Sequence, residues 1–348
     1  MPINYSIFLS NIDRYYDNLP NVKGKNIKIF TSFHIEEEMG KITRNDIFNL
    51  CKKIKQKGYK IISDVSIKNL EFFGNDFFEY LSKNKLVDWF RVDYGFDIKQ
   101  LIEISKLVPL CVNATGITIN DLEIYKRNNI KIIAMHNYYP RPETGLDIEF
   151  FNEINNNLRK YNVDILTFIS TDLEKRGPIF QGLPTLENQR YLKPYVSYVL
   201  LNELCGITNI FVGDGIISKT QVELINEYDE NKVIILPLIN IKDEEIINKT
   251  FTIRHDSPKN LFRIAESRVF SRKGKDVAPF NNNKERKLGS ITIDNINYGR
   301  YTGEIQITND DFCADPKINL IANIQPDYIE LLKVIKRDRK IKFVKEIK

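Results

Sequence analysis

Short apolar segments alternate with segments of helical periodicity over the first two thirds of the chain. The apolar segments span residues 5–9, 27–32, 60–65, 89–94, 109–114, 131–136, 164–170 and 209–214. Their lengths, and their content of Ile, Val and Phe, are typical of buried strands. After the second segment, Ile47, Leu50, Cys51 and Ile54 recur at helical spacing, and Gly58 follows them. Strands that alternate with helices in this way predict a parallel sheet.

Two further helices have recognisable beginnings. Asp147 precedes Phe150 and Phe151 as a helix cap would, and Ser218 and Gln221 have the spacing of a capping box. Eight strand–helix units within about 230 residues match the length of a closed β/α barrel. Closure also pairs the two edge strands that an open sheet leaves exposed. We therefore predict an α/β fold, a (β/α)8 TIM barrel, with an open parallel sheet as the alternative.

The pattern changes after Tyr228. Further strand-like segments span residues 233–241, 290–296, 301–308 and 318–324, and the last three alternate with turn-rich stretches in a way that is typical of antiparallel strands. Residues 272–290 are basic and rich in Asn, which indicates a long loop. We expect two domains: a barrel over residues 1–232 and a smaller β-rich domain over residues 233–348.

Composition excludes several classes of protein. The 348 residues are 28% charged and 42% hydrophobic, with a formal net charge of +5, which fits a globular protein better than a disordered or nucleic-acid-coating one. The first residues lack the pattern of a secretory signal, and no apolar run approaches ~18 residues. We therefore expect a cytoplasmic protein that binds neither nucleic acid nor membrane.

The cysteines and histidines do not form a metal-binding pattern. Cys51, Cys111, Cys205 and Cys313 lie far apart without a CxxC spacing, and the chain has only three histidines. We expect four buried, reduced thiols, no metal and no cofactor.

Polar residues follow seven of the eight predicted strands. They are Thr31, Ser32 and His34; Asp64 and Ser66; Arg91 and Asp93; Asn113 and Thr115; His136; Ser170; and Gly213 and Asp214. Because barrel active sites lie at the carboxyl ends of the strands, these residues are candidates for a site. Each also has a structural interpretation: an aspartate can cap a helix or brace a loop, Asp93 can pair with Arg91, and a histidine can lie in the core.

The chain resembles the 6-phospho-N-acetylmuramidase family over nearly its whole length. The most specific similarity is HNYYPRPETGL (136–146), and FTSFHIEEE (30–38), ISDVSIKNLEFFG (62–74), RVDYGF (91–96), KRGPIFQGLPTLENQR (175–190) and FVGD (211–214) also resemble family segments. Glu36 and Ile67 stand where the family pattern has proline. INYGRYTGEIQI (296–307) resembles the family's carboxyl-terminal domain. The resemblance implies a TIM barrel followed by a cyclophilin-like domain.

The resemblance also implies hydrolysis, in cell-wall sugar recycling, of the β-1,4 bond between 6-phospho-N-acetylmuramic acid and N-acetylglucosamine. Such a reaction needs an acid and a second carboxylate, or the sugar's own acetamido oxygen as nucleophile. Asp93 and Glu143 are our first candidates, with Asp64 and Asp214 as orienting or alternate catalytic groups. The sequence leaves retaining, inverting and substrate-assisted mechanisms open.

The remaining candidates would bind substrate. Barrels often bind phosphate at the loops after strands seven and eight, which here contain Lys175, Arg176 and Gly177. Arg141 is a second candidate for phosphate or for the lactyl carboxylate. Candidates for contacts with sugar hydroxyls, the acetamido group or other parts of the ligand are Ser32, His34, Arg91, Asn113, His136, Asn137 and Tyr138.

Two other functions remain open. A phosphosugar lyase or aldolase would need a Schiff-base lysine or metal ligands at the strand ends, and neither pattern is present. A non-catalytic phosphosugar sensor would keep the same polar residues. The oligomeric state and the role of the second domain do not follow from the sequence.

Overall fold

The computed structural model describes residues 3–33, 42–92, 95–267, 277–280 and 284–347. The chain divides into two compact units, residues 1–222 and residues 223–348.

The first unit contains a closed barrel of eight parallel strands. They are β1 (Ile3–Ser6), β2 (Lys28–Ser32), β3 (Lys60–Val65), β4 (Trp89–Val92), β5 (Leu110–Asn113), β6 (Ile132–Met135), β7 (Asp164–Ile169) and β8 (Asn209–Val212). The strands are neighbours in chain order, and β1 closes the barrel by pairing with β8, Ile3 opposite Ile210. The predicted barrel is confirmed, and the open sheet is wrong. Only β1 differs clearly from its predicted segment: it begins at Ile3 and not at Tyr5, because Ile3 and Asn4 pair with β8.

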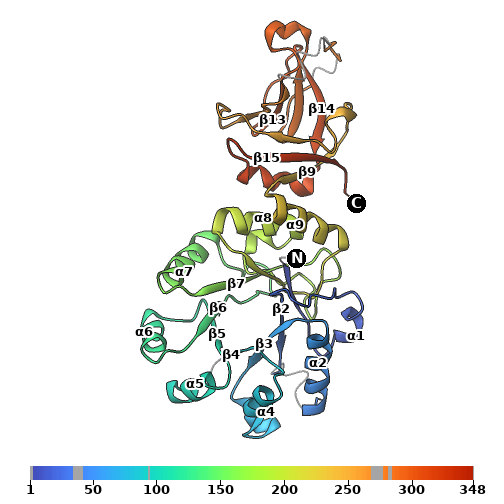
Figure 1. The fold of residues 1–348 in the computed structure, drawn as a ribbon. Helices are drawn as coiled ribbons and strands as arrows, with labels where there is room; N and C mark the ends of the chain where they lie inside the picture. Colours follow the sequence, from blue (N-terminus) through green and yellow to red (C-terminus); the bar gives the residue numbers. More distant parts are fainter. Residues whose placement is uncertain (1–2, 34–41, 93–94, 268–276, 281–283, 348) are drawn as a thin grey trace. The chain divides into compact units, whose positions relative to one another are not determined.

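Helices surround the barrel (Figure 1). They are α1 (Ile12–Tyr15), α2 (Arg44–Gln56), α3 (Lys68–Phe73), α4 (Phe77–Lys83), α5 (Ile98–Ser105), α6 (Ile119–Arg127), α7 (Ile148–Lys160), α8 (Pro194–Cys205) and α9 (Lys219–Asn231), which contains the unit boundary. The predicted cap at Asp147 is confirmed, since its side chain accepts a hydrogen bond from the Phe150 amide at 2.7 Å. Only half of the predicted capping box forms: Ser218 accepts from the Gln221 amide at 3.3 Å, but the Ser218 amide donates to Asp172 and the Gln221 side chain accepts from the Tyr195 amide.

Alternate residues of the strands fill the barrel interior with apolar side chains. They are Phe8, Phe30, Ile62, Cys111, Ile133, Met135, Leu166, Phe168 and Phe211. The rings of Phe30 and Phe168 pack edge to face, 5.6 Å between centroids. This packing fills the interior with apolar side chains, and barrel active sites form above such a core, at the carboxyl ends of the strands.

The second unit is built on a seven-stranded sheet. Its strands are β9 (Ile234–Ile239), β10 (Thr250–Thr252), β11 (Leu261–Arg263), β12 (Ser290–Asp294), β13 (Ile305–Thr308), β14 (Ile318–Ile324) and β15 (Lys340–Lys345), in the order β10-β15-β9-β14-β12-β13-β11. The predicted β-rich domain is confirmed. The antiparallel pattern holds for every pair except β9 and β15, which are parallel. The strand predicted from residue 301 begins only at Ile305, because Ile296–Tyr301 forms a 3₁₀ helix.

Three of the four cysteines are buried as expected, and all four are free thiols. Burial raises the pKa of the Cys111 thiol to about 12. The expectation is wrong for Cys313, which is exposed. It lies between β13 and β14, where the chain leaves the sheet.

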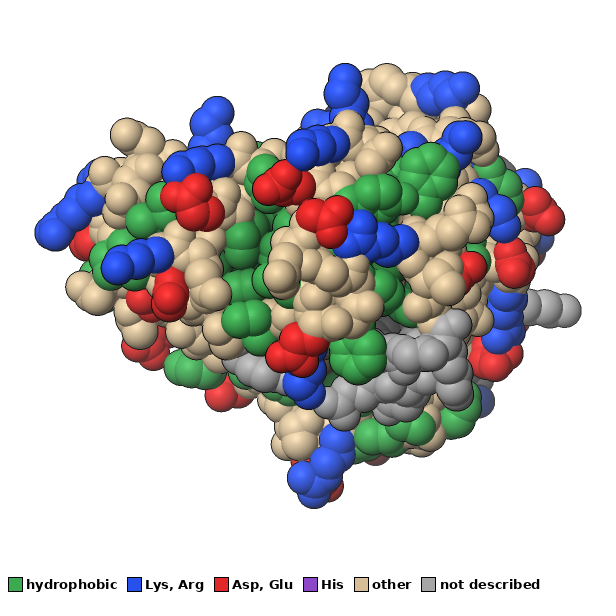
Figure 2. Space-filling view, turned by 90° about the horizontal axis from the view of Figure 1, so that it is seen from below, with side chains coloured by type: hydrophobic (Ala, Val, Ile, Leu, Met, Phe, Trp, Pro, Cys, Tyr) green, Lys and Arg blue, Asp and Glu red, His purple; other side chains and the backbone are tan. Residues whose placement is uncertain are grey.

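Charged side chains of both signs are interspersed over the face of the molecule seen in Figure 2. Within the described residues, none of the helices has the length and hydropathy needed to cross a membrane.

Candidate functional site

A small polar cavity lies above the apolar barrel interior. It has a volume of about 190 Å³ and is lined by Phe30, Asp64, Arg91, His136, Asn137, Tyr138 and Phe168. A larger hollow of about 530 Å³ lies beside α6, near Lys131 and Val163, which precede β6 and β7. That hollow is therefore at the amino-terminal ends of the strands, away from the rim where barrel sites form.

An ion pair stands in the wall of the cavity. Asp64 of β3 and Arg91 of β4 are opposite each other in register, and the Arg91 Nη1 to Asp64 Oδ1 distance is 2.8 Å. Both side chains are about nine-tenths buried, and Arg91 also donates to the Asn137 side-chain oxygen. The wall of the cavity thus holds a carboxylate whose Oδ1 accepts a charge-assisted hydrogen bond from a guanidinium.

Two of the predicted residues lie outside the described residues. They are Asp93, two positions after Arg91, and His34, which follows β2. Ser32 is described: it lies opposite Asp64 in the register of β2 and β3 and is buried.

Arg176 forms another part of the rim. Its guanidinium lies 3.7 Å from the centroid of the Phe8 ring, near the Tyr138 phenol. Burial raises the pKa of Tyr138, so its phenol stays protonated at neutral pH. Lys175 lies beside Arg176 with its ammonium 4.8 Å from the centroid of the Tyr191 ring. Stacking on an apolar ring leaves guanidinium N–H groups of Arg176 available for an anion.

Asp214 holds the loop that carries these cations. Its buried carboxylate accepts hydrogen bonds from the backbone amides of Thr171, Arg176 and Leu183 at 3.1, 3.0 and 3.3 Å. Burial raises the pKa of Asp214, and the three hydrogen bonds oppose that rise. These bonds make Asp214 a brace for the loop after β7.

His136 and Asn113 make structural contacts at the rim. The fully buried His136 ring packs on Phe151 of α7, and its Nε2 lies 2.8 Å from Asn155 Oδ1. Burial lowers the pKa of His136 to about 4, so the ring is neutral at pH 7. Asn113 Oδ1 accepts a hydrogen bond from the Thr115 amide at 3.0 Å, which shapes the turn after β5.

Glu143 and Arg141 are exposed on the loop after β6. This loop is held by two residues that the sequence analysis did not single out, Glu187 and Arg190. Arg190 donates to the carbonyls of Tyr139, Gly182 and Arg141, and also to Glu187. Glu187 in turn accepts from the Gly145 amide at 2.8 Å. The hydrogen bond from Arg190, with those from the Glu143 and Gly145 amides, lowers the pKa of Glu187 to about 2.

Replacing Arg190 with methionine should therefore destabilise the protein. The buried carbonyls of Tyr139 and Gly182 would lose their donor, at about 1–3 kcal/mol for each buried group left unsatisfied. We expect the free energy of unfolding to fall by about 3 kcal/mol, measured by denaturant titration. Arg127→Met removes an exposed arginine of α6 and should change stability little. Equal stability of the two variants would show that Arg190 does not hold the loops together.

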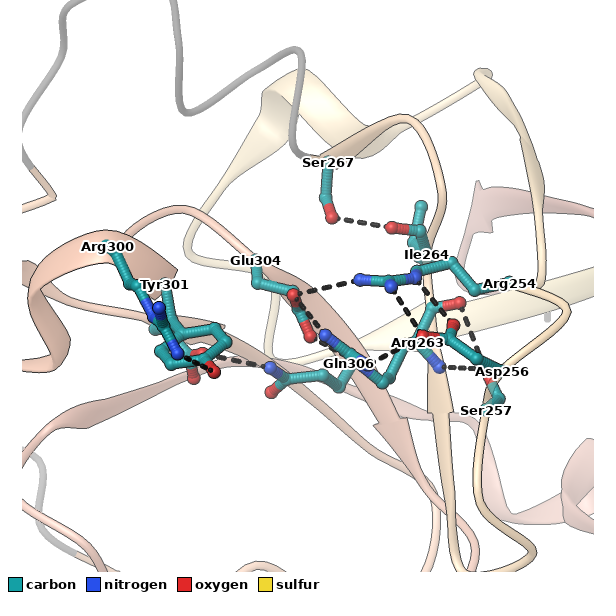
Figure 3. A network of polar contacts seen from close by, with 11 residues as sticks. Arg254, Asp256, Ser257, Arg263, Ile264, Ser267, Arg300, Tyr301, Glu304 and Gln306 are labelled. Atoms are coloured by element: carbon teal, nitrogen blue, oxygen red, sulfur yellow. Dashed lines mark hydrogen bonds and ion pairs between the residues drawn. The ribbon is translucent and has the colours of Figure 1, made fainter.

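A separate charged cluster lies in the second unit, on β11 and β13 and the segments before them (Figure 3). Arg263 donates to both carboxylate oxygens of the buried Glu304, and Arg254 reaches the same carboxylate at 3.3 Å. Gln306, two residues after Glu304, donates its side-chain amide to the Asp294 carboxylate at 3.1 Å. The segment INYGRYTGEIQI thus supplies Glu304 and Gln306 to a hydrogen-bonded, largely buried network.

Asp294 should make the second unit sensitive to pH. Burial raises the pKa of this carboxyl from 3.8 to about 7, so the folded state binds a proton that the unfolded chain has released. Its contribution to stability is therefore fully present below about pH 4 and is lost as the pH rises to about 7. We expect Asp294→Asn to raise the unfolding temperature of this unit by a few degrees at pH 8 and to change it little at pH 4.

Thermal unfolding followed by circular dichroism at both pH values measures this effect. Asp310→Asn, at an exposed position of the same unit, is the control. A stabilisation by Asp294→Asn that was the same at pH 4 and pH 8 would contradict the assignment.

A closed β/α barrel with a small polar cavity at the carboxyl ends of its strands belongs to the class of barrel proteins that hold a small polar ligand at that rim. Comparison with known protein families identifies one family within this class. Residues 5–227 match the family description "6-phospho-N-acetylmuramidase, N-terminal", and residues 232–344 match "6-phospho-N-acetylmuramidase, C-terminal". The chain belongs to the 6-phospho-N-acetylmuramidase family.

Two solved structures are similar to the whole chain. A conserved protein of unknown function from Enterococcus faecalis is 30% identical, with a TM-score of 0.84 and coverage of 99% of this chain and 97% of that one. An uncharacterized B. cereus protein is 19% identical, with a TM-score of 0.75 and coverage of 98% and 99%, and it supports the fold alone. No curated protein matches the chain.

Proposed function

We propose that this chain is a cytoplasmic glycoside hydrolase that cleaves the β-1,4 bond of 6-phospho-N-acetylmuramyl-N-acetylglucosamine in cell-wall sugar recycling. The observation that carries the proposal is a rim cavity of a family member that is lined by the buried carboxylate of Asp64, while the Arg176 guanidinium lies over Phe8, whose ring packs on the cavity residue Phe30. A carboxylate is what glycoside cleavage needs, and a cation is what a sugar phosphate needs.

Asp64 fits the role of the carboxylate that remains ionised. Because Arg91 and Asn137 fix its surroundings, its oxygens would face either the anomeric carbon or the N–H of the acetamido group. The first arrangement makes Asp64 a nucleophile or base, and the second makes it the group that orients a substrate-assisted attack. Asp93 and Glu143 stay our candidates for the acid that protonates the leaving oxygen.

Arg176 is our principal candidate for the phosphate ligand. Its guanidinium lies over the Phe8 ring, so little conformational freedom would be lost on binding. Lys175 and Arg141 would add positive charge, and Gly177 of the same loop would bring its backbone close to the phosphate. Ser32, Asn113 and Asn137 would bind sugar hydroxyls or the acetamido group. His136 would position the neighbouring Asn137 through its own contact with α7.

The test is turnover of the synthetic phosphorylated disaccharide by the full chain, followed by the release of reducing sugar and by mass spectrometry. Release of N-acetylglucosamine and 6-phospho-N-acetylmuramic acid supports the hydrolase. Tight binding without release would support the sensor, and products other than a water adduct would support the lyase or aldolase.

A further inference from the structure

The loop after β7 exposes apolar side chains at the rim of the barrel. Phe180 is 57% exposed and Tyr191 is 68% exposed, among the largest exposures of any aromatic ring in the described part of the chain. Leu173 and Ile179 of the same region are also exposed. Large rings that face solvent lose the free energy that burial would give them, so a cluster of them indicates a surface that becomes covered.

The backbone holds Phe180 in an unfavourable conformation. Its φ angle is +57°, in the left-handed region that a residue with a bulky side chain seldom adopts. Its ring lies against Gly177, where an added Cβ would approach the ring to 2.8 Å, so a larger residue at this position would displace the ring. Strained residues persist where the surroundings enforce them, often at ligand sites.

Tyr191 is held beside the same loop by polar contacts. Its hydroxyl donates to Gln181 Oε1 at 3.2 Å, and the Lys175 ammonium lies over its ring. The neighbouring Arg190 donates to the Gly182 carbonyl at 3.1 Å. These contacts join residues 180–182 to residues 190–191, so both rings stand on one part of the rim.

Arg176 connects this part of the rim to the cavity, because it lies over Phe8, whose ring packs on the cavity residue Phe30. Lys175, which contacts Tyr191, precedes Arg176, which contacts Phe8 and Tyr138. A ligand whose anionic end reaches Arg176 would therefore extend over Tyr191 and Phe180. The surface combines aromatic rings with one carboxamide and one ammonium group.

We propose that Phe180 and Tyr191 form an aromatic platform that binds the unphosphorylated sugar of the disaccharide, the one that leaves on cleavage. The apolar C–H face of a pyranose ring fits an aromatic face, while its hydroxyl and acetamido groups find hydrogen-bonding partners in Gln181 and Lys175. The proposal rests on the proposed function and adds the residues that select the leaving sugar.

The experiment compares two substrates: the phosphorylated disaccharide and 6-phospho-N-acetylmuramyl fluoride, which has no second sugar. For Phe180→Leu and Tyr191→Ala, we expect kcat/KM for the disaccharide to fall about three- to tenfold each. The fluoride should be hydrolysed within twofold of the normal rate. Phe180→Tyr, which keeps a ring, should retain activity toward both substrates.

Phe72→Ala and Phe150→Ala are matched controls, because these rings are 55% and 44% exposed on α3 and α7. These two substitutions should leave kcat/KM for both substrates unchanged. Equal losses for the disaccharide and the fluoride would overturn the platform, since they would show that the rings only support the loop. Dissociation of an oligomer by the two platform variants in sedimentation velocity would also overturn it, in favour of a contact between copies of the chain.

Binding of free N-acetylglucosamine separates this proposal from the proposed function. Saturation-transfer NMR should show contact with the normal protein and a loss of contact in the Phe180→Leu, Tyr191→Ala double variant. If the sugar binds at the platform but neither substrate is cleaved, the hydrolase fails and the platform stands. If the disaccharide is cleaved equally by the double variant, the platform fails and the hydrolase stands.

Discussion

Asp64→Asn is expected to lower kcat toward the phosphorylated disaccharide by about 10²–10⁴-fold, the usual range for loss of an acid–base group. Asparagine keeps the size of the side chain and can still accept a hydrogen bond from Arg91 through its carbonyl oxygen. It cannot carry the negative charge that a nucleophile, a base or an acetamido-orienting group needs. Substrate affinity should change much less than kcat, which steady-state and single-turnover kinetics can separate.

Asp164→Asn is the matched control for this variant. Asp164 is exposed at the first position of β7, at the opposite end of the barrel, so its replacement removes the same charge far from the cavity. Normal kcat in Asp64→Asn, with a lower unfolding temperature, would show that Asp64 only balances Arg91. Asp93→Asn, Glu143→Gln and Asp214→Asn would then become the decisive variants. For Asp214 we expect a KM effect to dominate, because its carboxylate binds three backbone amides of the loop.

Arg176→Ala should raise KM for the phosphorylated disaccharide by about ten- to a hundredfold, since a hydrogen bond to a charged group contributes about 1.5–3 kcal/mol. An unphosphorylated analogue should be affected much less, because it has no group that needs the guanidinium. Initial rates over a range of each substrate measure the two KM values. Arg141→Ala tests the second candidate in the same assay.

Arg14→Ala is a suitable control, because Arg14 pairs with Glu174 near the same loop yet is half exposed. Equal KM increases for the phosphorylated and unphosphorylated substrates would exclude a phosphate-binding role for Arg176. The Phe8 and Tyr138 contacts would then be structural, and the cation for the phosphate would have to be Lys175 or Arg141.

The barrel could be predicted because its signals are local. Apolar runs of strand length and helix caps such as Asp147 depend on residues close together in the sequence. Their order then leaves few arrangements, since parallel strands joined by helices close or form an open sheet. The placement of Asp64 and Arg91 at the rim followed in the same way, because both end consecutive strands.

Other features depended on contacts between distant segments. β15 lies parallel to β9 although paired positions such as Ile234 and Ile341 are 107 residues apart in the sequence, and no local pattern predicts that pairing. Cys313 resembled the other cysteines in sequence, yet the chain leaves the sheet there and the thiol is exposed.

The sequence by itself determined the order of the eight barrel strands and which residues end them, whereas it missed β10, β11 and β15 of the second unit. Only the tertiary structure decided the environment of each of those residues. His136 and Asn137 directly follow β6, yet the His136 ring packs on α7 and the Asn137 side chain accepts from Arg91, because adjacent side chains of an extended chain point to opposite sides. Asp214 and Arg190 act through backbone groups dozens of residues away, which only a folded chain brings within hydrogen-bonding distance.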